Sequence, residues 1–235
     1  MSALFEELDY QVTPIGAVSL RRRRILPLGV DVFEVLLGEE HLMSSLFTAS
    51  EVALAKLGLA ALGRAPEGGW TVTVGGLGLG YTAAAVLEDP DVARLEVVDL
   101  LAPVIEWHEK RLVPLDPPLA GDTRCTLRQG DFFALAASEE GFGAPQDAIL
   151  IDIDHTPDWL LDARSGSFYS QEGLAKLARH LKAGGVMGLW SDAGEDEAFM
   201  ARMASVFSEA WSEPVTFHNP LQDRPFTQTV YLARK

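Results

Sequence analysis

Three polar side chains stand at the end of the apolar stretch 147–152 and have the functional groups needed for acid–base chemistry. They are Asp152, Asp154 and His155. Carboxylates and imidazoles can take a proton from a nucleophile and orient its lone pair. Asp154 and His155 have a structural alternative, which is to cap the loop that leads to Pro157. The sequence predicts that these three residues are catalytic, and leaves open whether Asp152 or His155 is the base.

A second group with chemical potential is the glycine series Gly76, Gly78 and Gly80. Alternating β-branched residues at 72–74 precede it and predict a buried strand, and the alanine-rich segment 82–87 predicts a helix after it. Glycine lets the backbone turn tightly from strand to helix and lets a ligand approach without a Cβ in the way. The pattern predicts a ligand-binding loop. Its alternative is a glycine-rich turn that binds nothing.

Two further carboxylates lie where the next expected strands end. Asp99, followed by Leu100, is placed to accept hydrogen bonds from a ribose diol. Asp131 can accept from an adenine amino group while Phe132 packs on the ring. The alternative for Asp131 is to cap a helix that runs through Ala137, and the two roles are compatible. These residues and the three glycines predict a nucleoside site.

The glycine pattern fits two classes of nucleoside cofactor. Residues 78–83 match the G-x-G-x-x-A form of a dinucleotide site, and residues 76–80 equally match the G-x-G-x-G loop of S-adenosylmethionine enzymes. A dinucleotide enzyme has no need of Asp131, and an antiparallel pair of strands at the end of the chain is foreign to NAD domains. S-adenosylmethionine or its decarboxylated form is therefore favoured over NAD.

These groups require a parallel sheet, because the carboxyl ends of parallel strands bring ligand-binding residues to one edge. Strands alternate with helices after residue 48, which predicts an α/β, Rossmann-like domain with helices on both faces. The last two strands are too close for a crossover helix and must be antiparallel. The expected strands are 72–74, 95–98, 123–128, 147–152, 186–190, 215–218 and 229–233, and the expected helices are 49–62, 82–87, 102–111, 172–181 and 195–211.

Residues 1–48 differ from the rest and predict a small antiparallel β-meander, followed by the nucleoside-binding domain over 49–235. The basic run 21–24 lies in an expected strand. We interpret it as ion-paired or at an interface, because alternate side chains of a strand point to opposite faces and the protein is acidic. The strand 30–37 has apolar residues on both faces, which predicts a homodimer. These residues are Val32, Phe33, Val35, Leu36 and Leu37.

The composition sets limits on partners and location. The 235 residues carry a formal net charge of −15, which argues against nucleic acid and permits a cationic substrate. Cys125 is the single cysteine, so we expect no disulfide framework, no thiolate cluster and no metal site. No signal peptide or membrane-spanning apolar run is expected, which predicts a cytoplasmic protein that does not bind membranes.

The order of segments resembles the spermidine synthase (polyamine aminopropyltransferase) family, within the class I methyltransferase-like fold. The resemblance implies that fold and covers nearly the whole chain. Besides the N-terminal meander, it rests on VTVGGLGLGYTAAAVL, LEVVDLLAPVIEWH, GDFFALA, DAILIDIDHTP and LKAGGVMGLWS.

The chain departs from the family at residues that determine the reaction. Gly78 stands where the family's GGGDGG loop has an aspartate that helps to hold the aminopropyl group. Asp152 matches the first acid of the D-x-x-D-P segment that receives the amine, while His155 replaces the second and Asp154 is an extra acid. Residues 47–50 replace a tyrosine–histidine pair.

The resemblance implies a transferase that alkylates an amine-bearing small molecule with S-adenosylmethionine or its decarboxylated form. A methyltransferase on the same scaffold is an alternative, because an aspartate at position 78 would repel the carboxylate of intact S-adenosylmethionine. Gly78 and the N–H groups of the following helix therefore predict that the intact form binds at least as tightly as the decarboxylated one. A non-catalytic nucleoside-binding protein is a further alternative.

Overall fold

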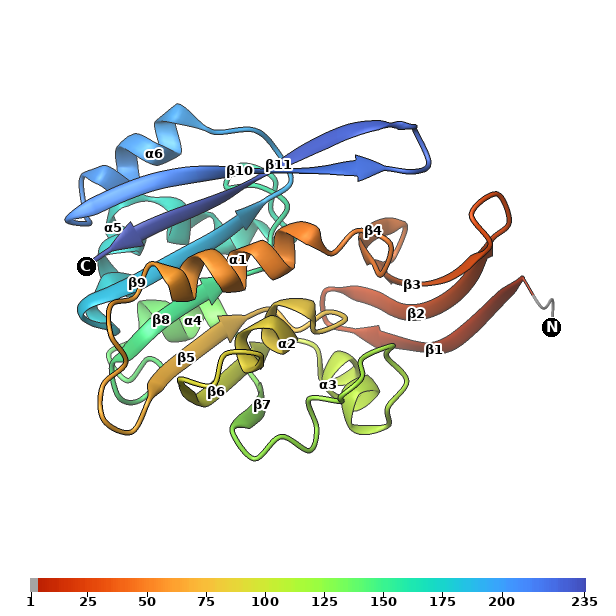
Figure 1. Cartoon of the computed structure of the whole chain (residues 1–235), viewed down its shortest axis with the longest axis horizontal. Helices are drawn as coiled ribbons and strands as arrows, with labels where there is room; N and C mark the ends of the chain where they lie inside the picture. Colours follow the sequence, from red (N-terminus) through yellow and green to blue (C-terminus); the bar gives the residue numbers. More distant parts are fainter. Residues whose placement is uncertain (1–3) are drawn as a thin grey trace.

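The computed structural model describes residues 4–235. They form a large helix-covered sheet and a smaller antiparallel sheet that projects from one end of it (Figure 1). The large sheet has the order β10-β11-β9-β8-β5-β6-β7, with β5 to β9 parallel and β11 antiparallel to both β9 and β10. This confirms the predicted α/β fold and its antiparallel end. The strands are β5 (Trp70–Gly75), β6 (Val92–Asp99), β7 (Cys125–Gln129), β8 (Gln146–Ile151), β9 (Leu181–Ser191), β10 (Glu209–Asn219) and β11 (Arg224–Arg234).

Helices cover both faces of this sheet because its central strands are apolar on both sides. In β8, Leu150 packs in one core while Ile149 and Ile151 pack in the other, as the two-residue period of a strand requires. The first core includes residues of α1 (Ala49–Ala60), α2 (Tyr81–Leu87) and α3 (Ala102–Glu109). The second includes residues of α4 (Phe132–Ala137), the 3-10 helix η1 (Ala163–Tyr169), α5 (Gln171–Arg179) and α6 (Glu197–Ala204).

The predicted N-terminal meander is present and has four strands. They are β1 (Phe5–Thr13), β2 (Gly16–Ile25), β3 (Val30–Leu37) and β4 (Glu40–Ser44). Each arginine of the basic run has a carboxylate partner on a neighbouring strand, which confirms the ion-paired interpretation. The pairs are Arg21–Glu7, Arg22–Glu6, Arg23–Glu34 and Arg24–Asp31.

The meander is attached to the large domain by buried contacts. Trp107 Nε1 on α3 donates to Asp9 Oδ2 on β1 at 2.6 Å. Val18 and Leu20 of β2 lie in the same core cluster as α1 and α2. The architecture changes between Ser44, the end of β4, and Ala49, the start of α1. The meander is thus fixed over the carboxyl ends of the large sheet.

Four of the five apolar residues of β3 that prompted the dimer prediction are buried or packed within the chain. Val32, Val35 and Leu37 are buried, and Phe33 packs against the core. Their apolar character is therefore explained without a second copy, and the homodimer stays a prediction.

Several element ends differ from those expected. Strand β1 was not anticipated, because its exposed and half-buried positions contain many polar residues. The helix expected over 195–211 ends at Ala204, and the last two strands are longer than predicted. Their eleven-pair ladder from 209–219 to 224–234 supplies backbone hydrogen bonds that local propensity does not reveal.

The order of strands reverses at β5, which lies between β6 and β8. In open parallel sheets a ligand crevice forms at the carboxyl ends of the strands at such a switch point. The glycine loop follows β5, Asp99 ends β6, Asp131 follows β7 and Asp152 follows β8. The topology therefore brings the predicted site residues to one edge of the sheet.

Candidate functional site

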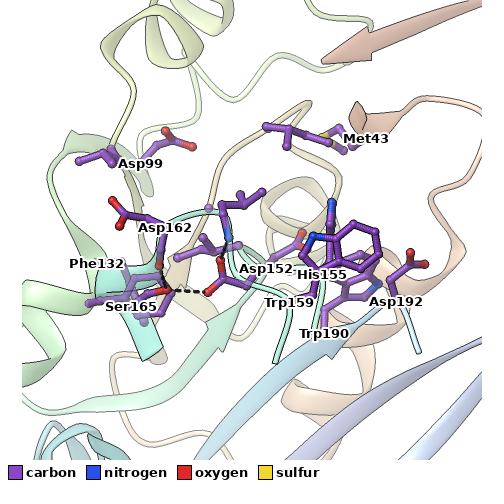
Figure 2. Close-up of a pocket in the computed structure, with 18 of the residues that line it drawn as sticks. Met43, Asp99, Phe132, Asp152, His155, Trp159, Asp162, Ser165, Trp190 and Asp192 are labelled. Carbon is purple, nitrogen blue, oxygen red and sulfur yellow. Dashed lines mark hydrogen bonds between the residues drawn. The ribbon is translucent and has the colours of Figure 1, made fainter. Parts of the chain in front are cut away.

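A cavity of about 1000 Å³ opens at this edge, between the large sheet and the N-terminal sheet. Asp99 and Phe132 lie at one end of it, Trp190 and Asp192 lie at the other, and Asp152 lies between them (Figure 2). Every predicted site residue except Gly80 lines this cavity. These residues are Gly76, Gly78, Asp99, Leu100, Asp131, Phe132, Asp152, Asp154 and His155.

The glycine loop lies so close to its neighbours that side chains are excluded. Gly76 has φ 89°, and a Cβ there would lie 2.0 Å from the carbonyl oxygen of Asp152. Gly78 has φ 46°, and a Cβ there would lie 2.3 Å from Met43 Sδ. Positive φ and close backbone approach are the two reasons why such a loop needs glycine. Gly80 lies behind the loop, against His108.

Met43 on β4 covers the loop from the N-terminal sheet. Its Sδ accepts a hydrogen bond from the backbone N–H of Leu79 at 3.0 Å. The N–H of Leu77 donates to Asp99, and the N–H of Gly80 donates to the carbonyl of Leu77. The backbone N–H groups of Leu77, Leu79 and Gly80 in the glycine loop are therefore engaged within the protein.

His108 on α3 supports the loop from the opposite side. Its Nε2 lies 2.9 Å from the carbonyl oxygen of Gly78, and burial lowers the pKa of the imidazole against the opposing effect of this contact. The neutral ring therefore donates from Nε2 to Gly78. His108 is therefore a buried packing residue that holds the glycine loop in place.

Asp99 ends β6 with both carboxylate oxygens on backbone amides. Oδ2 accepts from the N–H of Leu77 at 2.9 Å, and Oδ1 accepts from the N–H of Leu101 at 2.8 Å. Burial raises the pKa of Asp99, and the backbone hydrogen bonds oppose that rise. Each oxygen keeps further acceptor capacity toward the cavity. The residue both ties the glycine loop to β6 and presents an acceptor to a ligand.

Asp131 and Phe132 have structural partners. Asp131 Oδ1 accepts from the N–H of Ala134 at 3.0 Å, which makes it the N-cap of α4, as the alternative prediction had it. Phe132 is only 3% exposed, and its ring packs against those of Phe142 and Phe168. Because most of this ring lies in the core, stacking on an adenine can involve only the part that reaches the cavity.

Asp152 is the central carboxylate of the cavity, and it has a carboxylate neighbour on α1. Thr82 Oγ1 donates to Asp152 Oδ2 at 2.7 Å. Burial raises the pKa of Asp152 to about 6, against the effect of this hydrogen bond. Burial and then the nearby charge of Asp152 raise the pKa of Glu51 to about 8. Burial and mutual repulsion therefore favour a proton on this pair, and the rise in pKa is larger at Glu51.

The hydrogen bonds around Ser50 support the same assignment. Trp190 Nε1 donates to Ser50 Oγ at 2.9 Å, and Gln228 Nε2 donates to Asp192 Oδ1 at 2.5 Å. The Ser50 hydroxyl lies 2.6 Å from Gln228 Oε1 and 2.8 Å from Glu51 Oε2, but it has a single proton to donate. Gln228 Oε1 is an amide oxygen that can only accept, so the Ser50 proton goes to it. The contact between Ser50 and Glu51 then needs a proton on Glu51.

Asp154 is buried among hydrogen-bond donors from its own loop. Oδ1 accepts from the N–H of Leu161 at 2.7 Å, and Oδ2 accepts from Tyr169 at 2.8 Å and from Ser165 at 3.2 Å. Burial raises the pKa of Asp154, and these hydrogen bonds oppose the rise. The contacts favour a positioning role, which holds the loop between β8 and η1, over the predicted catalytic one.

His155 joins the two sheets at the cavity wall. Its Nε2 lies 3.3 Å from Glu40 Oε1 on β4, and its ring packs edge-to-face with Trp159 at 4.9 Å between ring centroids. Its carbonyl accepts from the N–H of Asp192 at 2.7 Å. These partners favour a role in closing the cavity, and leave Asp152 as the stronger candidate for the base.

Sequence reasoning did not identify the cavity residues Glu51, Met43 and Asp192. Asp192 follows β9, so the rule that strand ends carry site residues, applied to one more strand, would have found it. Glu51 and Met43 come from α1 and β4, and only the docking of the N-terminal region brings them to the site.

Over residues 4–235, no group of three or more histidine, cysteine, aspartate or glutamate side chains is arranged to hold a metal ion. Within the same range, no helix has the length and apolar character needed to cross a membrane.

Comparison with known proteins shows the fold. Neither the protein-family models nor the curated proteins that were compared match the sequence. Among solved structures, a spermidine synthase in complex with the transition-state analogue AdoDATO is similar with a TM-score of 0.74 and 17% identity, over 97% of this chain and 73% of that one. The spermidine synthase from Thermotoga maritima is similar with a TM-score of 0.71 and 17% identity, over 97% of this chain and 72% of that one. A probable spermidine synthase from Corynebacterium glutamicum is similar with a TM-score of 0.63 and 16% identity, over 100% of this chain and 80% of that one. The chain therefore has the fold of these synthases, as expected.

Proposed function

We propose that this protein transfers an aminopropyl group from decarboxylated S-adenosylmethionine to an amine. The observation that carries the proposal is the position of Asp152 in the middle of the cavity, where it accepts a hydrogen bond from Thr82 and has Glu51 as a carboxyl neighbour. The likeness in fold to spermidine synthases, one of them bound to a transition-state analogue, supports it. Asp99 and the glycine loop supply the nucleoside end, and Trp190 and Asp192 lie at the acceptor end.

The proposed step uses Asp152 as acceptor of the amine proton. An ammonium group bound at Asp152 gives one proton to the carboxylate and becomes a free amine. Its nitrogen lone pair forms a bond to the propyl carbon attached to sulfur, the carbon–sulfur bond breaks, and sulfur keeps that electron pair. The products are a secondary ammonium and neutral methylthioadenosine, and Asp152 releases its proton to solvent. Alignment of nitrogen, carbon and sulfur in the cavity supplies much of the rate.

The residues around the glycine loop determine whether intact or decarboxylated S-adenosylmethionine binds more tightly. Gly78 alone predicts that intact S-adenosylmethionine binds at least as tightly as the decarboxylated form. The N–H of Leu79 in the loop already donates to Met43, so this group is not free to bind a carboxylate of the donor. Asp99 and Asp131 add negative charge at the nucleoside end of the cavity. A donor that lacks a carboxylate is therefore favoured.

A side-by-side titration tests this choice. We expect decarboxylated S-adenosylmethionine to bind about tenfold more tightly than the intact form, a difference of about 1.4 kcal/mol. Isothermal calorimetry on the unmodified protein measures both affinities. Methyl transfer is the second candidate function, and the absence of a carboxylate at Gly78 supports it. Tighter binding of the intact form would favour this candidate.

The nucleoside site is tested at Asp99. Asp99→Ala should weaken binding of S-adenosyl compounds by about 1–3 kcal/mol, because a charged acceptor is lost. Asp99→Asn keeps one carbonyl acceptor and should lose less. Since Asp99 also holds Leu77 and Leu101, thermal unfolding of each variant must be checked alongside calorimetry. Unchanged affinity in a folded Asp99→Ala variant would contradict the assignment.

Transfer itself is tested by measuring methylthioadenosine released from decarboxylated S-adenosylmethionine in the presence of amines. Release that depends on an amine supports the proposal. Tight nucleoside binding with no transfer to amines would instead favour the non-catalytic alternative. Binding and turnover therefore have to be measured separately.

We also propose that the protein acts as a homodimer in the cytoplasm. The resemblance to the synthase family is the support for the dimer. Light scattering at micromolar concentration should give about twice the mass of one chain. A monomeric mass would refute the dimer and leave the reaction proposal unaffected.

A further inference from the structure

We infer that the acceptor is a monoamine attached to an aromatic or similarly bulky apolar group, rather than a linear diamine. This rests on the proposed function and specifies its second substrate. The inference follows from the end of the cavity that lies beyond Asp152, where the β10–β11 hairpin and the start of α1 form the wall.

The hairpin continues beyond the sheet and turns one face toward the cavity. Pairing of β11 with β9 ends at Thr229, while pairing with β10 continues to Arg224. Figure 1 shows this free end of the hairpin projecting on the same side as the N-terminal sheet. Because strand side chains alternate, Phe226 and Gln228 share the face of Val230, which packs in the core with α1. That face therefore passes from the core into the cavity.

Aromatic side chains line this end of the cavity, and we name them the aromatic compartment. Phe217 and Phe226 are opposite each other on the hairpin, with ring centroids 5.8 Å apart, and Phe47 lies 5.9 Å from Phe217. Trp159 and Trp190 complete the set. The three phenylalanines are only partly buried, so their rings keep surface that an apolar ligand can cover.

The charged groups of the cavity are not distributed as a linear diamine requires. A diamine has a cation at each end and needs two separate anionic sites. Glu51, Asp152 and Asp192 interact electrostatically as one cluster, and Gln228 already donates to Asp192. Glu40, on the wall near Trp159, already has His155 as its partner. Beyond this cluster the hairpin contributes phenyl rings and the uncharged amides of Asn219 and Gln222. The wall thus suits one ammonium group followed by an apolar body.

The volume allows both substrates to bind together. About 1000 Å³ is at the upper end of the range for small-molecule sites. With the nucleoside at Asp99 and the ammonium at Asp152, the remaining part of the acceptor extends toward Trp190 and the hairpin. Aromatic rings also attract the ammonium itself, which adds to the selection for amines.

The test compares 2-phenylethylamine with 1,4-diaminobutane as acceptors for decarboxylated S-adenosylmethionine. We expect kcat/KM to be about tenfold higher or more for 2-phenylethylamine, because only its ring fills the aromatic compartment. Phe217→Ala and Phe226→Ala should each lower that value about tenfold, while donor affinity by calorimetry stays the same. His218→Ala is the matched control, since His218 is the exposed neighbour of Phe217 on β10.

A second measurement separates this inference from the proposed function. A change in the tryptophan fluorescence of the protein reports amine binding without turnover, because Trp159 and Trp190 line the cavity. Binding of 2-phenylethylamine that is lost in Phe217→Ala supports the inference even when no transfer occurs, an outcome that would overturn the proposed function. Efficient transfer to 1,4-diaminobutane in preference to 2-phenylethylamine would overturn the inference and support the function. Phenylalanine variants that leave 2-phenylethylamine binding and turnover unchanged would also overturn it.

Discussion

Asp152→Asn should lower the rate of transfer by about 10²–10⁴-fold while leaving donor affinity unchanged, because the amide cannot accept the proton of the ammonium group. The amide oxygen can still accept from Thr82 Oγ1, so the local fold should survive. In the parent protein, kcat/KM should rise with pH as Asp152 loses its proton near pH 6. The measurements are methylthioadenosine release across pH and calorimetry with the donor.

Asp158→Asn is the matched control for this substitution. Asp158 is an exposed carboxylate on the same loop, outside the cavity, so the control variant should retain full activity. If Asp152→Asn keeps the parental rate, Asp152 is not the base, and His155→Gln becomes the variant to measure next.

Glu51→Gln should stabilise the protein at alkaline pH. The pKa of Glu51 rises from 4.5 to about 8 on folding, so between these values the folded state retains a proton that the unfolded chain has released. The free energy of unfolding of the parent then falls by about 1.4 kcal/mol for each pH unit in this window. Glutamine has no such proton to lose, so the variant gains relative to the parent as pH rises. The difference should reach roughly 2–5 kcal/mol by pH 8 and stay constant above it.

Urea unfolding at pH 5, 7 and 9 measures this difference. Glu67→Gln, in the exposed loop before β5, is the matched control and should follow the parent at each pH. A gain for Glu51→Gln that does not change with pH would show that Glu51 is an ordinary ionised carboxylate. In that case both Glu51 and Asp152 are ionised in the cavity, and the assignment of a proton to Glu51 is wrong.

The sequence was sufficient for features that depend on local pattern. The alternation at 72–74, the glycines and the acids at the ends of strands predicted the parallel sheet and the residues at its carboxyl edge. This succeeded because strand period, crossover handedness and the switch-point rule leave few arrangements for a βαβ chain. Asp99 and Asp152 were found in this way, and both line the cavity.

Features that depend on distant contacts were decided by the tertiary structure. Met43 and Glu51 reach the site only because the N-terminal sheet and α1 dock over the glycine loop and β8. Asp154 and His155 have the residue types of catalytic groups, yet the fold gives them other partners. Tyr169, at the end of the following loop, donates to Asp154, and Glu40 on the N-terminal sheet contacts His155. Protonation depends on burial and on neighbouring charge, and neither is a property of the local sequence. For that reason the sequence located Asp152, and only the fold placed its proton-bearing partner Glu51 beside it.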